Sequence, residues 1–284
     1  AIAKAARAAG AELCTEAEVN EILLDGEGVA RGVRLWSGRE IAADAVLAAT
    51  TPAVAFQKLL PQEKLPADFR QAISSIDYTS PVTKINVAVR ELPNFTALPH
   101  SGRAAAPHHQ STIHMNSESM DIVHQAVVDF REGRASRRPL IEMTIPSSVD
   151  RSIVDGDGHV VLLFTQYTPY LPADGPWTEK TKQEYAKRVF SDIDAYAPNF
   201  SSSVVDYEVL TPPDLERTFG LTGGNIFHGS MSLDQLYWLR PAAGLANFST
   251  PIKGLFLAAS GAHPGGGVCG APGRLAAMRV LNQI

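Results

Sequence analysis

The stretch Gly254–Leu281 constrains the fold of this chain more than any other. Its first part, 254–260, is a short apolar run without helical spacing, which predicts a buried strand. The middle part, 261–273, is rich in glycine and leaves a backbone that a ligand can approach closely. The last part, 274–281, is rich in helix formers. A strand, a loop and a helix N-terminus in this order predict a cradle for a ligand with negative or electron-rich atoms. The expected buried stripe of the helix consists of Leu275, Met278 and Leu281.

Within this loop, Gly265, Gly267 and Gly270 satisfy the dinucleotide-binding pattern G-x-G-x-x-G. That pattern belongs in a strand–helix–strand unit with an acidic residue about twenty positions later. The sequence ends at Ile284, so neither a second strand nor a ribose-binding carboxylate follows. We therefore expect a second, closing contact on a large cofactor. The alternative is a glycine-rich turn that binds no ligand.

Composition excludes several classes of function. A length of 284 residues suffices for one large domain or two interleaved ones. The net charge of −5 gives no basic field for nucleic acid. Apolar runs such as 160–164 are far too short to cross a bilayer, although peripheral membrane contact stays open. Cys14 and Cys269 make no disulfide framework, which favours a reducing compartment: the cytoplasm of a bacterium, or the mitochondrial matrix in a eukaryote.

The order of expected elements predicts an α/β or α+β fold with one long insertion. Residues 1–52 combine a helix, a short strand at 11–15, a meander over 19–43 and a strand at 45–49 that is buried on both faces. We expect this region to join 251–284 in one domain, with strand 45–49 near strand 254–259. A second domain, 53–250, lies between them. Its expected strands are 82–89, 140–145, 159–167 and 203–210, and its clearest helices are 120–132 and 179–196.

Several motifs together resemble one family. They are Gly261-Ala-His-Pro-Gly-Gly-Gly-Val-Cys-Gly-Ala-Pro-Gly-Arg274, Gly223–Gly229, Leu233–Leu236 with Arg240-Pro241, Pro212–Leu221 and Ile145–Ser147. In this order they resemble segments of the phytoene-desaturase-like FAD-dependent oxidoreductases, and the likeness runs from about residue 1 to the C-terminus. The resemblance implies the C-terminal half of a two-domain flavoprotein. An incomplete Rossmann-like FAD-binding domain would carry an inserted substrate domain built on a mixed sheet with helices.

The resemblance also implies a function. The family oxidises a hydrophobic small-molecule substrate by hydride transfer to FAD. An N-terminal strand–glycine loop–helix holds the pyrophosphate of FAD in this family, and no such segment precedes Ala1. The chain begins without a methionine and abruptly in a helix, so we expect a fragment or a processed chain. By itself it is then expected to be inactive, with FAD absent or weakly bound. The alternatives are amine oxidation or isomerisation on the same scaffold, or a non-catalytic binding or assembly module.

The resemblance assigns candidate site residues. His263 is the catalytic candidate, since it could position the substrate or bond the flavin edge, and its other interpretation is a hydrogen bond that braces the loop. Asn225 and His228 are candidates for lining the substrate cavity, or else form a turn packed under the cofactor domain. N–H groups at Gly270 and Ala271 would favour negative charge on reduced flavin. The expected cofactor contacts are Gly261, Ala262, His263, Pro264, Gly265, Gly266, Gly267, Val268, Gly270 and Ala271.

No metal site is predicted. His108, His109 and His114 lack a clear cysteine or carboxylate partner, so we interpret them as a solvated polar loop. The sequence 155–158 has the beginning of a calcium loop without its final glutamate, and a hairpin turn explains it. Cys269, just before the last helix, has either a lowered pKa or the role of a small buried residue.

Overall fold

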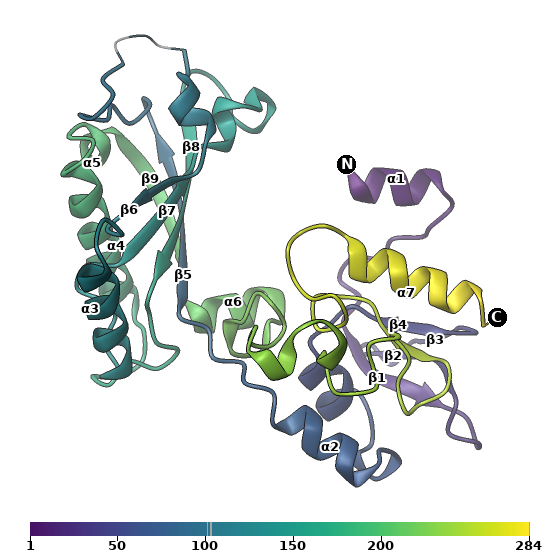
Figure 1. Cartoon of the computed structure of the whole chain (residues 1–284). Coiled ribbons are helices and arrows are strands. Elements are labelled where there is room, and N and C mark those ends of the chain that lie inside the picture. Colours follow the sequence, from purple (N-terminus) through teal and green to yellow (C-terminus); the bar gives the residue numbers. More distant parts are fainter. Residues whose placement is uncertain (101, 103, 284) are drawn as a thin grey trace. The chain divides into compact units, whose positions relative to one another are not determined.

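The computed structural model describes residues 1–100, 102 and 104–283, which form two compact units (Figure 1). Unit 1 contains Ala1–Asp77 and Ile226–Ile284, and unit 2 contains Tyr78–Asn225. These boundaries correct the expected divisions after residues 52 and 250. Segment 53–77 belongs to unit 1 because, for example, the Ile22 N–H donates to the Leu59 carbonyl at 2.8 Å. Segment 226–250 belongs there because Arg240 Nε donates to the Ser260 carbonyl at 2.7 Å.

Unit 1 begins with α1 (Ile2–Ala8) and an antiparallel meander of β1 (Val19–Leu24), β2 (Ala30–Leu35) and β3 (Glu40–Ala42). The Asp25 carboxylate closes the predicted hairpin by accepting the N–H groups of Glu27 at 3.0 Å and Val29 at 2.9 Å. The expected strand at 11–15 is wrong, since this segment has no strand conformation.

The C-terminal strand returns to the N-terminal region as predicted. β4 (Val46–Ala48) and β10 (Leu255–Leu257) form a parallel pair in which Leu255 lies opposite Val46. Burial of β4 on both faces is wrong, because Leu47 is 39% exposed and only one face packs on the core.

The terminal helix α7 (Ala271–Leu281) buries a different stripe from the one expected. Met278 and Leu281 are exposed, whereas Pro272, Ala276 and Val280 face the interior. Small residues therefore set this contact, because they let the helix lie close to the strands. The remaining helical segments of unit 1 are a π-helical turn (Val54–Lys58), α2 (Ala67–Ser74) and short 3-10 turns at Gln62–Lys64, Leu233–Gln235 and Tyr237–Leu239.

Unit 2 is built on a five-stranded sheet with the order β6-β7-β8-β5-β9. Every pairing in it is antiparallel, which corrects the expected mixed sheet. Parallel neighbours need a long crossover, but β7 and β8 are joined only by loops and short turns. The strands are β5 (Val82–Val89), β6 (Ile113–Met115), β7 (Leu140–Thr144), β8 (His159–Gln166) and β9 (Val204–Leu210).

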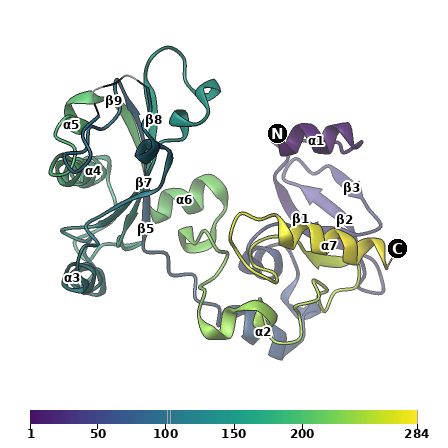
Figure 2. The same ribbon diagram turned by 45° about the horizontal axis from the view of Figure 1, so that its top comes forward.

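Helices cover one face of this sheet. Figures 1 and 2 show α3 (Met120–Arg131), α4 (Glu179–Asp194) and α5 (Phe200–Ser203) on the same side. The four-residue spacing that predicted α4 is confirmed, because Tyr185, Val189 and Ile193 are all buried against the strands. The Tyr185 hydroxyl donates to Thr165 Oγ1 at 2.9 Å, so this polar atom is satisfied inside the core. α6 (Pro212–Phe219) follows β9, and further 3-10 turns lie at Pro107–Gln110, Pro146–Ser148, Arg151–Ile153 and Thr222–Gly224.

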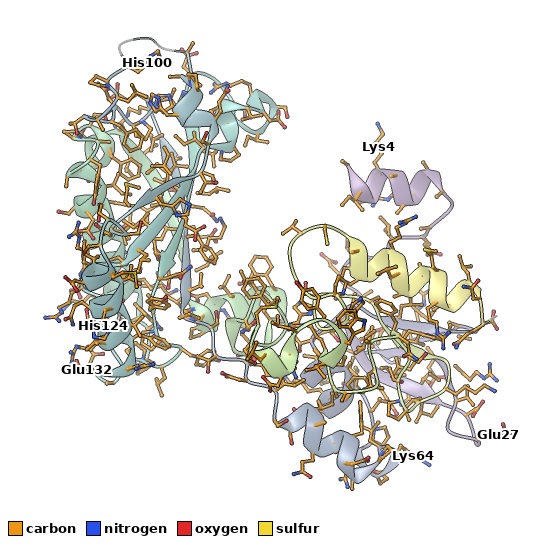
Figure 3. All side chains as sticks on the ribbon, viewed as in Figure 1. Lys4, Glu27, Lys64, His100, His124 and Glu132 are labelled. Atoms are coloured by element: carbon orange, nitrogen blue, oxygen red, sulfur yellow. The ribbon has the colours of Figure 1, made fainter. Side chains whose placement is uncertain are left out.

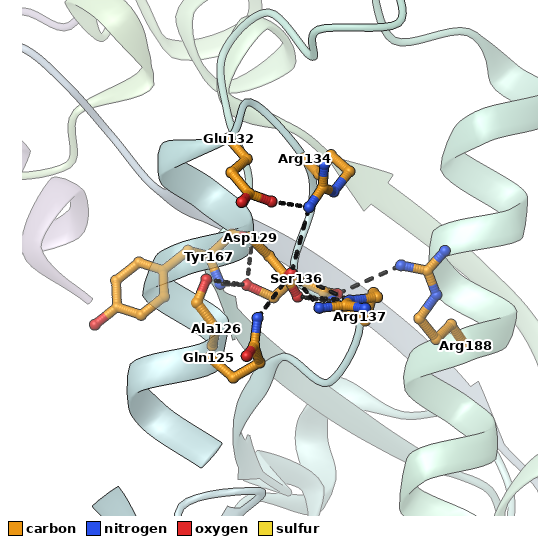
Figure 4. Close-up of polar contacts among 9 residues, drawn as sticks. All are labelled: Gln125, Ala126, Asp129, Glu132, Arg134, Ser136, Arg137, Tyr167 and Arg188. Atoms are coloured by element: carbon orange, nitrogen blue, oxygen red, sulfur yellow. Dashed lines mark hydrogen bonds and ion pairs between the residues drawn. The ribbon is translucent and has the colours of Figure 1, made fainter. Parts of the chain in front are cut away.

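A buried carboxylate fixes the connection between α3 and β7 (Figure 4). Asp129 is 1% exposed and accepts hydrogen bonds from the Arg137 N–H at 2.9 Å and from Arg137 Nη2 at 2.9 Å. Burial raises its pKa, but the Arg137 bonds outweigh burial, and the pKa of Asp129 lies below its usual range. Ser136 adds a second link, because its hydroxyl donates to the Ala126 carbonyl and accepts the Tyr167 N–H. Among the described helices, none is long and apolar enough to span a bilayer.

Candidate functional site

The glycine loop of unit 1 has a buried stem and an open outer half. Gly261, Ala262 and Gly265 are buried, while residues 267–270 are exposed. Turns close the stem, since the Gly265 N–H donates to the Ala262 carbonyl at 2.8 Å. In contrast, no backbone N–H of residues 266–270 donates a hydrogen bond within the part of the chain that the structure describes. The outer half therefore presents a run of free donors directly before α7.

The glycines of this loop serve different purposes. A Cβ added to Gly261 would lie 2.5 Å from Pro52 Cδ, and one added to Gly266 would lie 2.6 Å from Phe227 Cδ1. These two glycines are needed for close packing inside unit 1. At Gly267 and Gly270 an added Cβ would meet nothing within 4 Å, but φ is +133° and +68°. Glycine is required at these two positions because other residues rarely adopt such positive φ angles. The space around them is open to a ligand.

His263 lies in an aromatic setting. Its ring stacks on Trp238 at a centroid distance of 6.1 Å with 23° between the planes, and Phe248 lies 6.3 Å away. The Nδ1 atom of His263 is buried and has no hydrogen-bond partner among the described residues. Bracing of the loop by a bond from Nδ1 is therefore not seen, and this enclosed atom keeps its hydrogen-bonding capacity unused.

His228 lies against the start of the loop stem. Its Cβ lies 3.4 Å from the Cβ position of Gly261, and its Nδ1 is also buried without a partner in the described chain. Burial lowers the pKa of His228 most, the nearby Arg240 charge lowers it further, and a bond to the Thr50 backbone opposes both. The ring is therefore expected to be neutral at neutral pH.

Arg240 holds these segments together and was noticed in the sequence only as part of a motif. Its side chain is 1% exposed. Nη1 donates to the carbonyls of Ser230 at 3.0 Å and Gln235 at 2.9 Å, and Nε reaches Ser260. Nη2 donates to the carbonyls of Phe227 and Gly229. One guanidinium thus fastens the 227–235 segment to the start of the glycine loop, a role that no periodicity or spacing could reveal.

Strained backbone gathers around the same loop. His228, Tyr237, Phe248 and Val268 have φ values of 59°, 48°, 70° and 52°. Such values are uncommon outside glycine, and for β-branched Val268 they mark a true outlier. Left-handed residues of this kind cluster at functional sites more often than elsewhere.

Asn225 is held by bonds within unit 2. It lies in unit 2, whereas His228 lies in unit 1. Its side chain is 4% exposed, and Nδ2 donates to the Thr79 carbonyl at 3.0 Å. That bond ties the two ends of unit 2 together, which fits the structural interpretation of Asn225 better than the substrate-lining one.

Lys84 is a second residue that the sequence did not single out. It lies on β5, on the sheet face opposite the helices, with Phe164 of β8 as its cross-strand neighbour. The side chain is half-buried, and burial lowers the pKa of its ammonium group. No described residue bonds to it. Only the pairing of β5 with β8 creates this setting, so composition and spacing gave no signal.

Other expectations concern histidine and cysteine. His109 is 1% exposed and its Nε2 donates to the Pro93 carbonyl at 2.9 Å, so the expected solvated loop is wrong at this residue. The described residues contain no group of three or more metal-ligating side chains arranged for a metal ion. Cys269 is exposed, which corrects its interpretation as a small buried residue.

Comparison with known proteins decides the family. Residues 1–281 match the family described as flavin containing amine oxidoreductase. The chain belongs to this family. It is 51% identical over 286 residues to pyridine nucleotide-disulfide oxidoreductase domain-containing protein 2 of Rattus norvegicus, covering 100% of this chain and 49% of that protein. It is 28% identical over 148 residues to a 4,4'-diapophytoene desaturase of Staphylococcus aureus, covering 50% of this chain and 28% of the enzyme.

Solved structures agree in fold. A double mutant of putrescine oxidase superposes with a TM-score of 0.56 at 15% identity, covering 97% of this chain and 51% of that one. An oxidoreductase from Methanosarcina mazei superposes with a TM-score of 0.55 at 16% identity, covering 99% of this chain and 52% of that one. The predicted resemblance and the α/β class, with a partial flavoprotein fold, are thereby confirmed. The chain spans about half the length of the curated relatives that it matches most fully.

The loop of unit 1 fits the flavin that the family implies. A flavin ring presents electron-rich nitrogen and carbonyl oxygen atoms, which require hydrogen-bond donors. The unpaired N–H groups of 266–270 supply donors, and the open surface at Gly267 and Gly270 lets a planar ring approach the backbone. The Nδ1 atoms of His228 and His263 also lack partners among the described residues, but both are enclosed by protein.

Proposed function

We propose that this chain is the substrate-binding half of an FAD-dependent oxidoreductase that oxidises a hydrophobic small molecule. The observation that carries the proposal is the run of unpaired backbone N–H groups over 266–270, directly before the N-terminus of α7. The flavin, when bound, supplies the hydride acceptor, and the protein supplies binding, orientation and electrostatics. The expected cofactor contacts are residues 261–268, 270 and 271.

The loop's part in this chemistry is electrostatic. Reduced flavin carries more negative charge than oxidised flavin, and fixed N–H dipoles stabilise a developing negative charge at little reorganisation cost. The N-terminus of α7 adds the positive end of a helix dipole at Gly270 and Ala271. Arg240 acts through the loop rather than on the cofactor, since it fixes the carbonyls on which the loop's position depends.

His263 is assigned to the edge of the flavin or to the substrate. Its Nδ1 has no protein partner, while Trp238 and Phe248 hold the ring by stacking and edge contact. An imidazole ring held in this way keeps a fixed orientation toward the loop. The same aromatic side chains also favour a second candidate function, amine oxidation, because aromatic groups accommodate a cationic or neutral amine beside the flavin.

The substrate is assigned to the open sheet face of unit 2. Leu162 and Phe164 of β8 lie on this face and are half-buried, so they form an apolar surface without being sealed in the core. Lys84 lies beside Phe164. Its ammonium group, with a lowered pKa, gives up its proton more readily than an exposed lysine and could accept one from a substrate.

We also propose that the 284-residue chain, studied alone, binds FAD weakly and does not turn over. Charge-assisted bonds to a pyrophosphate are worth about 1.5–3 kcal/mol each. The described residues of unit 1 contain no strand–glycine loop–helix–strand unit of the kind that binds a pyrophosphate. The loss of two or three such bonds weakens binding by roughly a hundredfold to a millionfold.

The test uses the protein extended to the length of its curated relatives. Its visible spectrum should show bound oxidised flavin, and an apolar alkane- or alkene-bearing substrate should bleach it anaerobically. Bleaching by primary amines alone would move the assignment to amine oxidation. A purified, folded protein without any flavin would overturn both and favour a binding or assembly module.

A further inference from the structure

Unit 2 contains an open cavity of about 1090 Å³ at one end of its sheet. It lies where Val89 of β5 pairs with His159 of β8. The chain enters and leaves unit 2 at Tyr78 and Asn225, close to the opposite ends of β5 and β9. β5 has 8 residues, so about 24 Å of strand separates its two ends. His100 marks the cavity end of unit 2 in Figure 3, and Glu132 marks the other end.

Buried polar side chains form the floor of this cavity. His109, Ser147 and His159 line it and are 1%, 0% and 9% exposed. Polar groups are costly to bury, and a cluster of them beside open space indicates a site rather than a packing defect. The two imidazoles are kept neutral, because burial lowers the pKa of both His109 and His159.

The tautomer of His159 follows from its neighbours. Arg151 Nη1 donates to His159 Nδ1 at 3.1 Å, so Nδ1 is the acceptor and Nε2 carries the proton. No described residue accepts from Nε2, and Nε2 is not among the fully enclosed atoms that lack a partner. His159 is thus a nine-tenths-buried donor that faces accessible space in the cavity wall.

Two arginines flank this donor. Arg151 is fixed by its bonds to the carbonyls of Gly156 at 2.7 Å and Gly158 at 2.9 Å. Arg90 directly follows Val89, the cross-strand partner of His159, and its described bond is a long one of 3.5 Å to the Ser202 carbonyl. Of the nearby carboxylates, Glu91 accepts from Asn199 Nδ2 at 2.9 Å, and Asp157 lies exposed at the rim. The lining thus places two arginines and the His159 donor beside two carboxylates, of which Glu91 already has a partner in Asn199.

A hydrolytic serine is excluded by the same contacts. Ser147 Oγ lies 3.3 Å from His159 Nδ1, but it accepts the Val160 N–H at 3.0 Å, and Arg151 already occupies the imidazole acceptor. His159 Nδ1 therefore cannot act as a free general base for Ser147.

We propose that this cavity is a second small-molecule site, separate from the glycine loop, that binds the carboxylate or phosphate group of an organic anion through Arg90, Arg151 and His159. Guanidinium groups recognise both kinds of oxyanion with paired donors. A volume of about 1090 Å³ exceeds what an inorganic ion fills and suits a molecule of drug or metabolite size. The organic part would contact Leu92 and Pro93 on the wall.

The experiment titrates the full chain with two probes, inorganic phosphate and citrate, each up to about 10 mM, where millimolar affinities are measurable. Binding is followed by calorimetry and by the ¹⁵N resonance of His159 Nε2. Citrate distinguishes a carboxylate-binding site from one that accepts only phosphate. Either probe should bind and shift the Nε2 resonance.

Arg90→Met is the main variant, because the Arg90 side chain makes only the one long described bond and its loss should leave the fold intact. We expect it to weaken binding about tenfold or more. Arg70→Met, at an exposed residue of α2 in unit 1, is the matched control and should bind as wild type. His159→Gln, which keeps a side-chain N–H donor, should retain more affinity than His159→Ala. The proposal is overturned if neither probe binds, or if Arg90→Met binds as tightly as Arg70→Met.

Discussion

Arg240 is the residue on which the shape of the glycine loop depends most. Replacing it with methionine keeps much of the side-chain volume but removes every donor. Five carbonyl groups then lose their hydrogen bonds, those of Phe227, Gly229, Ser230, Gln235 and Ser260. A buried carbonyl left unsatisfied costs about 1–3 kcal/mol, and some of the five would be rescued by water. We expect Arg240→Met to destabilise unit 1 by about 3–5 kcal/mol, a large part of an ordinary domain's stability.

Hydrogen exchange followed by mass spectrometry is the suitable assay, because it reports the two units separately. A loss of 3–5 kcal/mol corresponds to roughly two to nearly four orders of magnitude faster exchange in peptides from 226–262. Peptides from β8 in unit 2 should be unchanged. Arg240→Lys keeps the charge but not the planar fork, so it should recover only part of the protection.

Arg70→Met is again the control, since Arg70 is exposed and should tolerate the change. The reasoning about Arg240 is refuted if Arg240→Met changes exchange in 226–262 by less than about fivefold, which is below about 1 kcal/mol. It is also refuted if Arg240→Lys restores full protection, because one ammonium group cannot replace five guanidinium bonds.

Three further predictions follow from particular contacts. Burial opposes ionisation of Asp214, but bonds from Thr211, Lys182 and Arg217 outweigh it and lower its pKa to about 2. Because this folded-state pKa lies below the ordinary value of 3.8 for an aspartate, the stabilisation is present above about pH 4 and is lost as the pH falls toward about 2. Thermal unfolding should show Asp214→Asn less stable than wild type by up to about 2 kcal/mol at neutral pH, with the gap closing in acid; a constant gap would contradict this. Gly266→Ala should destabilise unit 1, because the added Cβ meets the Phe227 ring. Adding Phe227→Ala in a double variant should relieve this loss. If the two losses measured in denaturant melts are additive, the clash is contradicted. In the protein extended to the length of its curated relatives, replacing Gly270 with a bulky residue should abolish flavin retention. An unchanged flavin-to-protein absorbance ratio would contradict the cofactor role of the loop.

Local patterns predicted most of the elements. The hairpin at Asp25, the helix carrying Tyr185 and the return of the C-terminal strand to β4 were all readable from spacing and turn residues. These features depend on interactions between near neighbours or on the requirement that an apolar strand be covered. The same logic failed for α7, where exposed Met278 and Leu281 look like core residues but small Ala276 makes the contact.

The boundaries between the two units and the roles of the buried polar residues could not be predicted from the sequence. The divisions at 77/78 and 225/226 depend on long-range contacts such as that between Ile22 and Leu59, which no composition change marks. Arg240 looks like a surface residue in the sequence, because a buried arginine is exceptional unless its donors are satisfied. Lys84 became notable only through its pairing with β8. Of the candidate site, the glycine loop was readable, but the residues that support it were not.

A titration of the ¹⁵N-labelled chain with FAD, followed by amide chemical shifts, tests the central claim most directly. The account predicts weak binding, with amide shifts confined to residues 261–271 and a dissociation constant weaker than micromolar. Shifts clustered elsewhere, for example around Arg90, or none at saturating FAD, would contradict the assignment of the loop to the flavin. One-to-one binding at micromolar or tighter affinity would contradict the proposal that this chain holds FAD only weakly.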